Sequence, residues 1–188
     1  MKKLLPLLLL AIMCLGGPPP AAAAPPKEGD SLPALKFAAP AQAAQARYLG
    51  LATGQGQFSL GQVKASHLLV EVFSMYCTFC QVDAPQVNQL HELIKQQDLE
   101  GKLKMVGLGA GNSEYEVGVY RKKFNVAFPL LPDADFSAHK ALGQPRTPFF
   151  ILLKLSGQGA PQVLYTHLGS IGQAQDFLAT LKQKAGLK

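Results

Sequence analysis

The stretch that decides the fold is residues 67–80, which read HLLVEVFSMYCTFC. Residues 67–74 form an almost continuous apolar run that is rich in β-branched and aromatic side chains and interrupted by one acid, Glu71. Such a run is typical of a strand buried on both faces of a sheet. Residues 78–97 then show helical spacing. The apolar side chains on one stripe of this helix are Val87, Leu90 and Ile94.

On both sides of this strand and helix, further segments complete an α/β pattern. Two strands close together near the carboxyl end, followed by a helix, predict a hairpin covered by that helix. The full order therefore predicts an α/β sandwich with a parallel half and an antiparallel half. Strands are expected at residues 34–37, 103–108, 149–155 and 163–167. Helices are expected at residues 43–49, at 113–124 with a capping box of Ser113 and Glu116, at 135–142 with Asp135 as cap, and at 173–184.

The composition fits one domain with some length left for a targeting segment. The chain has 188 residues, 48% of them hydrophobic, which is enough for a packed core. Its formal net charge is +6, yet no run of Lys and Arg is interleaved with aromatic residues. We therefore expect no nucleic-acid partner.

The amino terminus predicts export. Two lysines precede an apolar run that ends near Leu15 and is too short to span a bilayer. We expect a signal at residues 1–24, a Pro/Ala linker at 25–32 and the folded domain at 33–188. Two processing routes remain open: cleavage within the alanines after the apolar run, or lipidation of Cys14. Met13 precedes that cysteine, where lipoprotein signals usually have a small residue.

Both routes place the mature protein outside the cytoplasm, either in the periplasm or anchored to a membrane and facing the periplasm. A single acyl chain at Cys14 would tether the protein to the membrane without spanning it. A lipid anchor is therefore one possible membrane contact, and no transmembrane segment is expected.

Cys77 and Cys80 are the candidate redox centre. Two intervening residues on the first turn of a helix bring two sulfurs close enough to bond. The unpaired N–H groups at that helix end favour a thiolate on the first cysteine. We expect Cys77 to attack a substrate disulfide and Cys80 to resolve the mixed disulfide. Half of a zinc site is the weaker interpretation because the chain has no second cysteine pair, and a structural disulfide in so short a loop would be strained.

Two acids stand near this motif. A strand covered on both faces offers Glu71 no solvent, so burial should raise its pKa and let it exchange a proton with Cys80. The alternative is that Glu71 reaches solvent or pairs with a lysine. Asp83 lies in the second turn of the helix, where the helix dipole alone could explain an acid. His91, farther along the helix, is expected to be solvated.

These residues resemble the thioredoxin superfamily, and specifically its exported TlpA-like/redoxin branch. The matching features are the strand at residues 67–74, the Cys77-Thr78-Phe79-Cys80 motif, Pro85 in the helix, and Thr147-Pro148. The resemblance implies a thioredoxin-like fold, in which a central mixed sheet is flanked by helices, and the activity of a protein thiol:disulfide oxidoreductase. No cofactor and no metal are implied, since the cysteine pair carries the electrons.

The same resemblance assigns roles to further positions. It implies that Pro148 is preceded by a cis bond and faces the cysteine pair, and that Glu71 and Asp83 occupy positions where the family keeps acids. Its substrate-holding positions correspond to Tyr76, Thr78, Phe79, Thr147 and Pro148.

Two departures from the family pattern leave the direction of electron flow open. Tyr76 stands where the family usually has Trp, and Thr78-Phe79 differs from the dipeptides of thioredoxin and of cytochrome c maturation reductases. Residues 40–57 look like an insertion before the catalytic strand.

The leading hypothesis is a reductase of protein disulfides, which could include those of apocytochromes c, with a membrane thiol carrier as electron donor. One alternative is a thiol peroxidase. It lacks support because Ser74 and Val70 stand where the peroxidase signature has Thr and Pro. The other is a copper- or metal-binding module, for which the four histidines are too scattered.

Overall fold

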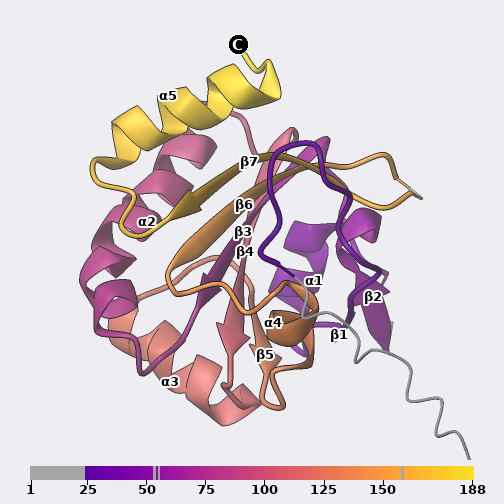
Figure 1. The fold of residues 1–188 in the computed structure, drawn as a ribbon, viewed down its shortest axis with the longest axis vertical. Coiled ribbons are helices and arrows are strands. Elements are labelled where there is room, and N and C mark those ends of the chain that lie inside the picture. Colours follow the sequence, from indigo (N-terminus) through magenta and orange to yellow (C-terminus); the bar gives the residue numbers. More distant parts are fainter. Residues whose placement is uncertain (1–23, 53, 55, 158) are drawn as a thin grey trace, which may run out of the picture.

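The computed structural model describes residues 24–188 except 53, 55 and 158, so Cys14 and all but the last residue of the predicted signal lie outside the described residues. A five-stranded sheet forms the centre of the molecule (Figure 1). Its strands are β3 (His67–Phe73), β4 (Leu103–Ala110), β5 (Leu130–Asp133), β6 (Phe149–Lys154) and β7 (Gln162–Leu168). They lie in the order β5-β4-β3-β6-β7, with β3, β4 and β5 parallel and with β6 and β7 antiparallel to their neighbours.

Helices cover both faces of this sheet, as expected from the sequence. The longest helix, α2, lies with α3 and α5 on one face, and α1 and α4 lie on the other with a small two-stranded sheet (Figure 1). The mixed sheet flanked by helices is therefore confirmed. The helices are α1 (Ala43–Leu49), α2 (Thr78–Gln96), α3 (Glu114–Phe124), α4 (Ser137–Ala141) and α5 (Ala174–Ala185), and the small sheet pairs β1 (Lys36–Ala38) with β2 (Gln57–Ser59).

β3 is the central strand, and all seven of its residues are buried. Successive side chains of a strand point to opposite faces. Leu69 and Phe73 pack in the cluster beneath α2, so Glu71 between them faces the same helix. Val70 and Val72 pack on the other face. The sequence thus buries a carboxyl group under the helix that carries both cysteines.

β5 is absent from the elements expected from the sequence. The strand has only four residues, and Pro129 and Pro132 interrupt its apolar pattern. It pairs in parallel with β4 at the edge of the sheet. An edge strand needs hydrogen bonds on one side only, which is why it tolerates a proline that an inner strand would not.

Part of the segment expected to be a linker lies against the domain. The N–H of Gly29 donates to the carbonyl of Val163 at 2.9 Å, and the N–H of Val163 donates to the carbonyl of Asp30 at 2.8 Å. The side chain of Leu32 is buried in the core. Residues 29–32 therefore run along the outer edge of β7. Within the described part of the chain, no helix is both long and apolar enough to cross a membrane.

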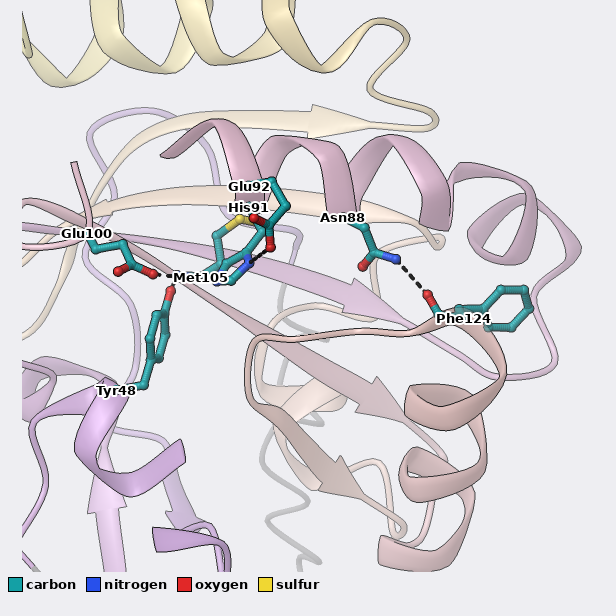
Figure 2. Close-up of polar contacts among 7 residues, drawn as sticks. All are labelled: Tyr48, Asn88, His91, Glu92, Glu100, Met105 and Phe124. Atoms are coloured by element: carbon teal, nitrogen blue, oxygen red, sulfur yellow. Dashed lines mark hydrogen bonds and ion pairs between the residues drawn. The ribbon is translucent and has the colours of Figure 1, made fainter. Parts of the chain in front are cut away.

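The expectation that His91 is solvated was wrong, because residues distant in sequence cover it. The ring lies between Tyr48 of α1 and Phe128, with ring centroids 5.9 and 5.6 Å away, and only 6% of the residue is exposed. Figure 2 shows it beside Glu92 and Glu100. Burial lowers the pKa of His91. The hydroxyl of Tyr48 accepts the N–H of Met105, which fixes α1 to the sheet.

Candidate active site

The nucleophile position is the first turn of α2. Cys77 is the N-cap residue of this helix, and its Sγ accepts a hydrogen bond from the backbone N–H of Cys80 at 3.2 Å. A donor at a helix amino terminus stabilises negative charge on the atom that it contacts. Cys77 is partly exposed, Cys80 is fully buried, and both are free thiols. The structure therefore brings the two cysteines together as expected and leaves the first one open to solvent.

Three hydrogen bonds hold the loop before Cys77. The side-chain oxygen of Asn112 accepts the N–H of Met75 at 2.8 Å, and the side-chain nitrogen of Gln81 donates to the Met75 carbonyl at 2.7 Å. The N–H of Cys77 donates to the Ser74 carbonyl at 3.0 Å. Asn112 is fully buried, and its role could not be predicted from the sequence because its partner lies 37 positions away.

The segment before β6 reaches the reactive sulfur. The peptide bond between Thr147 and Pro148 is cis, as the resemblance implied. The thiol of Cys77 donates to the carbonyl of Thr147 at 3.4 Å. Pro148 is buried and Thr147 is half-buried. Thr147 and Pro148 thus lie against the cysteine motif although they are 70 positions away.

Cys80 is the buried partner of the pair. Burial, followed by the hydrogen bond to Cys77, raises the pKa of the Cys80 thiol well above its ordinary value. The hydroxyl of Tyr120 donates to the carbonyl of Cys80 at 3.0 Å, which ties α2 to α3. Cys80 therefore remains a thiol until a nearby group accepts its proton.

Glu71 is buried beneath α2, as the sequence predicted. Only 3% of the residue is exposed, and its Oε1 has no hydrogen-bond partner among the described residues. Burial, and secondarily the negative charge of Asp83, raises the pKa of Glu71 to about 8. The same carboxyl group also acts on Cys80, whose pKa it raises when it is charged. Glu71 can therefore hold or release a proton near neutral pH on the side of the sheet that faces the helix of Cys80.

Asp83 is equally buried but bonded differently. Its Oδ1 accepts the hydroxyl of Ser170, and its Oδ2 accepts the N–H of Ile171 at 3.1 Å. Both donors belong to the turn between β7 and α5. Asp83 therefore links this turn to α2, and its charge acts on Glu71.

The surface around the cysteines is aromatic. Tyr76 and Phe79 are 69% and 72% exposed, and Thr78 between the cysteines is exposed as well. The hydroxyl of Tyr76 donates to Glu116, and hydrogen bonds from Ser113 and then from Tyr76 lower the pKa of Glu116 to about 2. Glu116 also closes the expected capping box of α3 with Ser113. Tyr76 is therefore held at the start of α3 while its ring faces solvent.

Asp133, rather than the expected Asp135, is the main acceptor at the start of α4. Its carboxylate accepts the N–H groups of Ala138 and His139, both at 2.9 Å, and the hydroxyl of Ser137. The carboxylate of Asp135 accepts the N–H of Ser137 but no N–H of the following residues of α4. The sequence did not indicate Asp133 because it lies at the end of β5, the strand that was missed.

Taken together, the geometry supports a two-step exchange of disulfides. A solvent-facing sulfur stands at a helix amino terminus, a second sulfur is buried one turn further along, and a carboxyl group is buried on the face of the sheet that this helix covers. These groups can attack a disulfide, break the resulting mixed disulfide and move one proton.

Comparison with known proteins gives one family match. A family model described as Redoxin matches residues 27–180. The thiol-disulfide oxidoreductase ResA of Halalkalibacterium halodurans is 20% identical to the chain over 128 residues, which cover 67% of this chain and 68% of ResA.

Solved structures share the fold at low sequence identity. A Chlorobium tepidum protein assigned as the thiol:disulfide interchange protein DsbE superposes with a TM-score of 0.63 at 16% identity, covering 86% of this chain and 99% of that one. A secreted disulfide oxidoreductase of Mycobacterium tuberculosis gives a TM-score of 0.52 at 19% identity, covering 70% and 90%.

Proposed function

Because the chain belongs to the Redoxin family, we propose that it is a thiol-disulfide oxidoreductase that works through Cys77 and Cys80. The resemblance to the thioredoxin superfamily found in the sequence is confirmed by this match. One observation carries the assignment of the reacting atom. The Sγ of Cys77 reaches solvent and accepts the N–H of Cys80 at the amino terminus of α2.

In the first step, the thiolate of Cys77 attacks one sulfur of a substrate disulfide. A bond forms between that sulfur and Cys77, and the other substrate sulfur leaves as a thiolate that takes a proton from solvent. The N–H of Cys80 supports the attacking charge. The substrate chain is held around the mixed disulfide by five residues of the two segments beside Cys77: Tyr76, Thr78, Phe79, Thr147 and Pro148.

In the second step, Cys80 loses its proton to the carboxylate of Glu71 and attacks Cys77. The Cys77–Cys80 disulfide forms, and the substrate leaves with both of its sulfurs reduced. Two of the causes that raise the pKa of Cys80 come from Cys77 itself, as a hydrogen-bond partner and as a nearby charge. Both disappear once Cys77 is bonded to the substrate, which favours proton transfer at that stage.

Asp83 acts in this scheme as a positioning residue. Its charge raises the pKa of Glu71, and its hydrogen bonds to Ser170 and Ile171 hold the turn before α5. Both effects reach the sulfurs through other groups.

The physiological direction that we propose is reduction of disulfides in exported proteins, apocytochromes c among them, with electrons from a membrane thiol carrier. The sequence of residues 1–24 supports a periplasmic or membrane-anchored location, with Cys14 as the candidate site of a lipid anchor. The M. tuberculosis structure of the same fold is also described as a secreted protein.

Reduction of insulin by the purified protein, coupled to a dithiol, tests the activity. We expect turnover in the wild type, loss of turnover in Cys77→Ser, and accumulation of a mixed disulfide in Cys80→Ser that mass spectrometry detects. Undiminished turnover in Cys77→Ser would contradict the mechanism.

The reduction potential of the cysteine pair tests the direction. Equilibration with glutathione or dithiothreitol should give a value near that of thioredoxin, about −270 mV, for a reductase. A value near that of a strong oxidant, about −120 mV, would overturn the proposed direction and leave the cysteine chemistry intact.

A further inference from the structure

A hollow of about 650 Å³ lies beside the cysteine motif, next to the nucleophile. It is open to solvent and is lined by the cysteine motif, by the end of β4, by Phe136 and α4, and by the segment before Pro148. Thr147 lines the hollow, and its carbonyl accepts a hydrogen bond from the thiol of Cys77. The hollow is therefore directly adjacent to the reacting sulfur. Its volume is that of an ordinary ligand pocket. The principal lining side chains are Tyr76, Phe79, Phe136, His139 and Arg146.

Phe136 is held in this wall at a conformational cost. Its φ is 60°, in the left-handed region that bulky residues avoid and that Asn or Gly would adopt more easily. The ring lies directly over Gly111, since a Cβ at that position would come within 2.2 Å of it. Even so, Phe136 remains 44% exposed. A strained backbone that presents a large apolar ring to solvent indicates a role for the ring outside the core.

The walls of the hollow are held by hydrogen bonds. The carboxylate of Asp133 accepts the N–H groups at the start of α4, and the ring Nε2 of His139 lies 2.9 Å from the carbonyl of Pro145. Tyr76 is held by Glu116 on the opposite side. The hollow is thus preformed, which lowers the entropic cost of binding a chain there.

The charged side chain that lines the hollow is the positive Arg146. Arg146 is exposed, and its guanidinium has no hydrogen bond or ion pair in the described part of the chain. Among the described lining residues, none is acidic. The nearby acids Glu116 and Asp133 are already engaged by the donors named above. A partner group that contacts Arg146 should therefore be a carboxylate, which can accept two hydrogen bonds from the guanidinium.

We propose that this hollow is a substrate subsite that selects polypeptides with a large apolar side chain and an acidic residue beside the reacting cysteine. The apolar side chain packs against Phe136 and Tyr76, and the carboxylate contacts Arg146. The inference rests on the proposed disulfide exchange at Cys77, because the subsite matters only when a substrate cysteine reaches that sulfur.

A panel of short disulfide-bearing peptides tests the subsite. Each peptide carries one cysteine joined by a disulfide to a fluorescent leaving thiol, with Phe or Ala and Asp or Lys as its neighbours. The reduced enzyme forms its own disulfide and releases both thiols, so the fluorescence gives kcat/KM. We expect the Phe/Asp peptide to react about tenfold faster than the Ala/Lys peptide, which corresponds to about 1.4 kcal/mol.

Two variants locate this preference in the hollow. Arg146→Glu should reverse the order of the Asp and Lys peptides, a result that general damage to the fold would not produce. Phe136→Asn, which suits the left-handed backbone, should abolish the preference for Phe over Ala. Arg47→Glu on α1 and Tyr115→Gln on α3 are the matched controls, since both residues are exposed and lie outside the hollow. Both controls should keep the wild-type preferences.

The outcomes separate the two proposals. Equal rates for all peptides in the wild type, or preferences that persist in both hollow variants, would overturn the subsite while disulfide exchange stands. Failure of the wild type to reduce any peptide would overturn the exchange activity and the subsite with it.

Discussion

Glu71 on β3 and Asp83 on α2 are two carboxyl groups buried to nearly the same extent, yet their surroundings differ. Asp83 accepts hydrogen bonds from Ser170 and Ile171 on its two oxygens, whereas Oε1 of Glu71 has no partner among the described residues. Burial alone therefore does not assign a role to an acid. An acid with donors ties segments together, and one without donors is free to take up a proton.

The largest expected difference between the two acids is in how stability depends on pH. Burial, and then Asp83, raises the pKa of Glu71 from 4.5 to about 8 in the folded state. Between these values the unfolded chain releases the proton that the folded chain keeps. Wild-type stability should therefore fall as pH rises, by on the order of 1 kcal/mol per pH unit, and level off above pH 8.

The Glu71→Gln variant has no proton to release at this position, so its stability should not show this fall. The difference in free energy of unfolding, variant minus wild type, should increase by several kcal/mol from about pH 5 to pH 8. Urea denaturation of both proteins across this range measures the difference. Parallel curves for the two proteins would show that Glu71 does not keep a proton in the folded state.

The next largest effect should come from Asp83→Ala. This change leaves the Ser170 hydroxyl and the buried Ile171 N–H without their acceptor, which should cost about 2–3 kcal/mol. The matched control is Asp176→Ala in the exposed first turn of α5, with an expected loss below about 1 kcal/mol. Equal losses in urea denaturation would mean that the hydrogen bonds of Asp83 contribute no more than a surface charge.

Exchange kinetics should then separate the two acids by function. Glu71→Gln should slow the step in which Cys80 attacks the mixed disulfide by about tenfold or more, because the proton acceptor is lost. Asp83→Asn should slow that step less, since Glu71 remains. Rapid-quench measurement of substrate release from the mixed disulfide follows this step alone. If the step were slower in Asp83→Asn than in Glu71→Gln, Asp83 rather than Glu71 would be the proton acceptor.

The sequence could predict the burial of Glu71 but not the bonding of Asp83, and the reason is distance along the chain. The neighbours of Glu71 in its own strand are apolar, so a local pattern reports its environment. The donors to Asp83 lie 87 and 88 positions away, in a turn with no distinctive pattern.

The same reasoning separates the other successes from the failures. The cysteine motif, Pro148 and the capping box of Ser113 depend on short patterns that can be recognised locally. β5 is short and interrupted by proline, and His91 is covered by Tyr48 and Phe128 from other segments. Only the folded chain brings such residues together.

The smallest expected effect concerns the interaction between the two acids. The negative charge of Asp83 is the second cause that raises the pKa of Glu71, so Asp83→Asn should lower that pKa. The pH–rate profile of the resolving step should move to lower pH by the same amount, because Glu71 becomes a carboxylate earlier. Carbon-13 NMR of the Glu71 carboxyl group gives the pKa directly. An unchanged pKa would show that Asp83 acts on the site only through the turn that it holds.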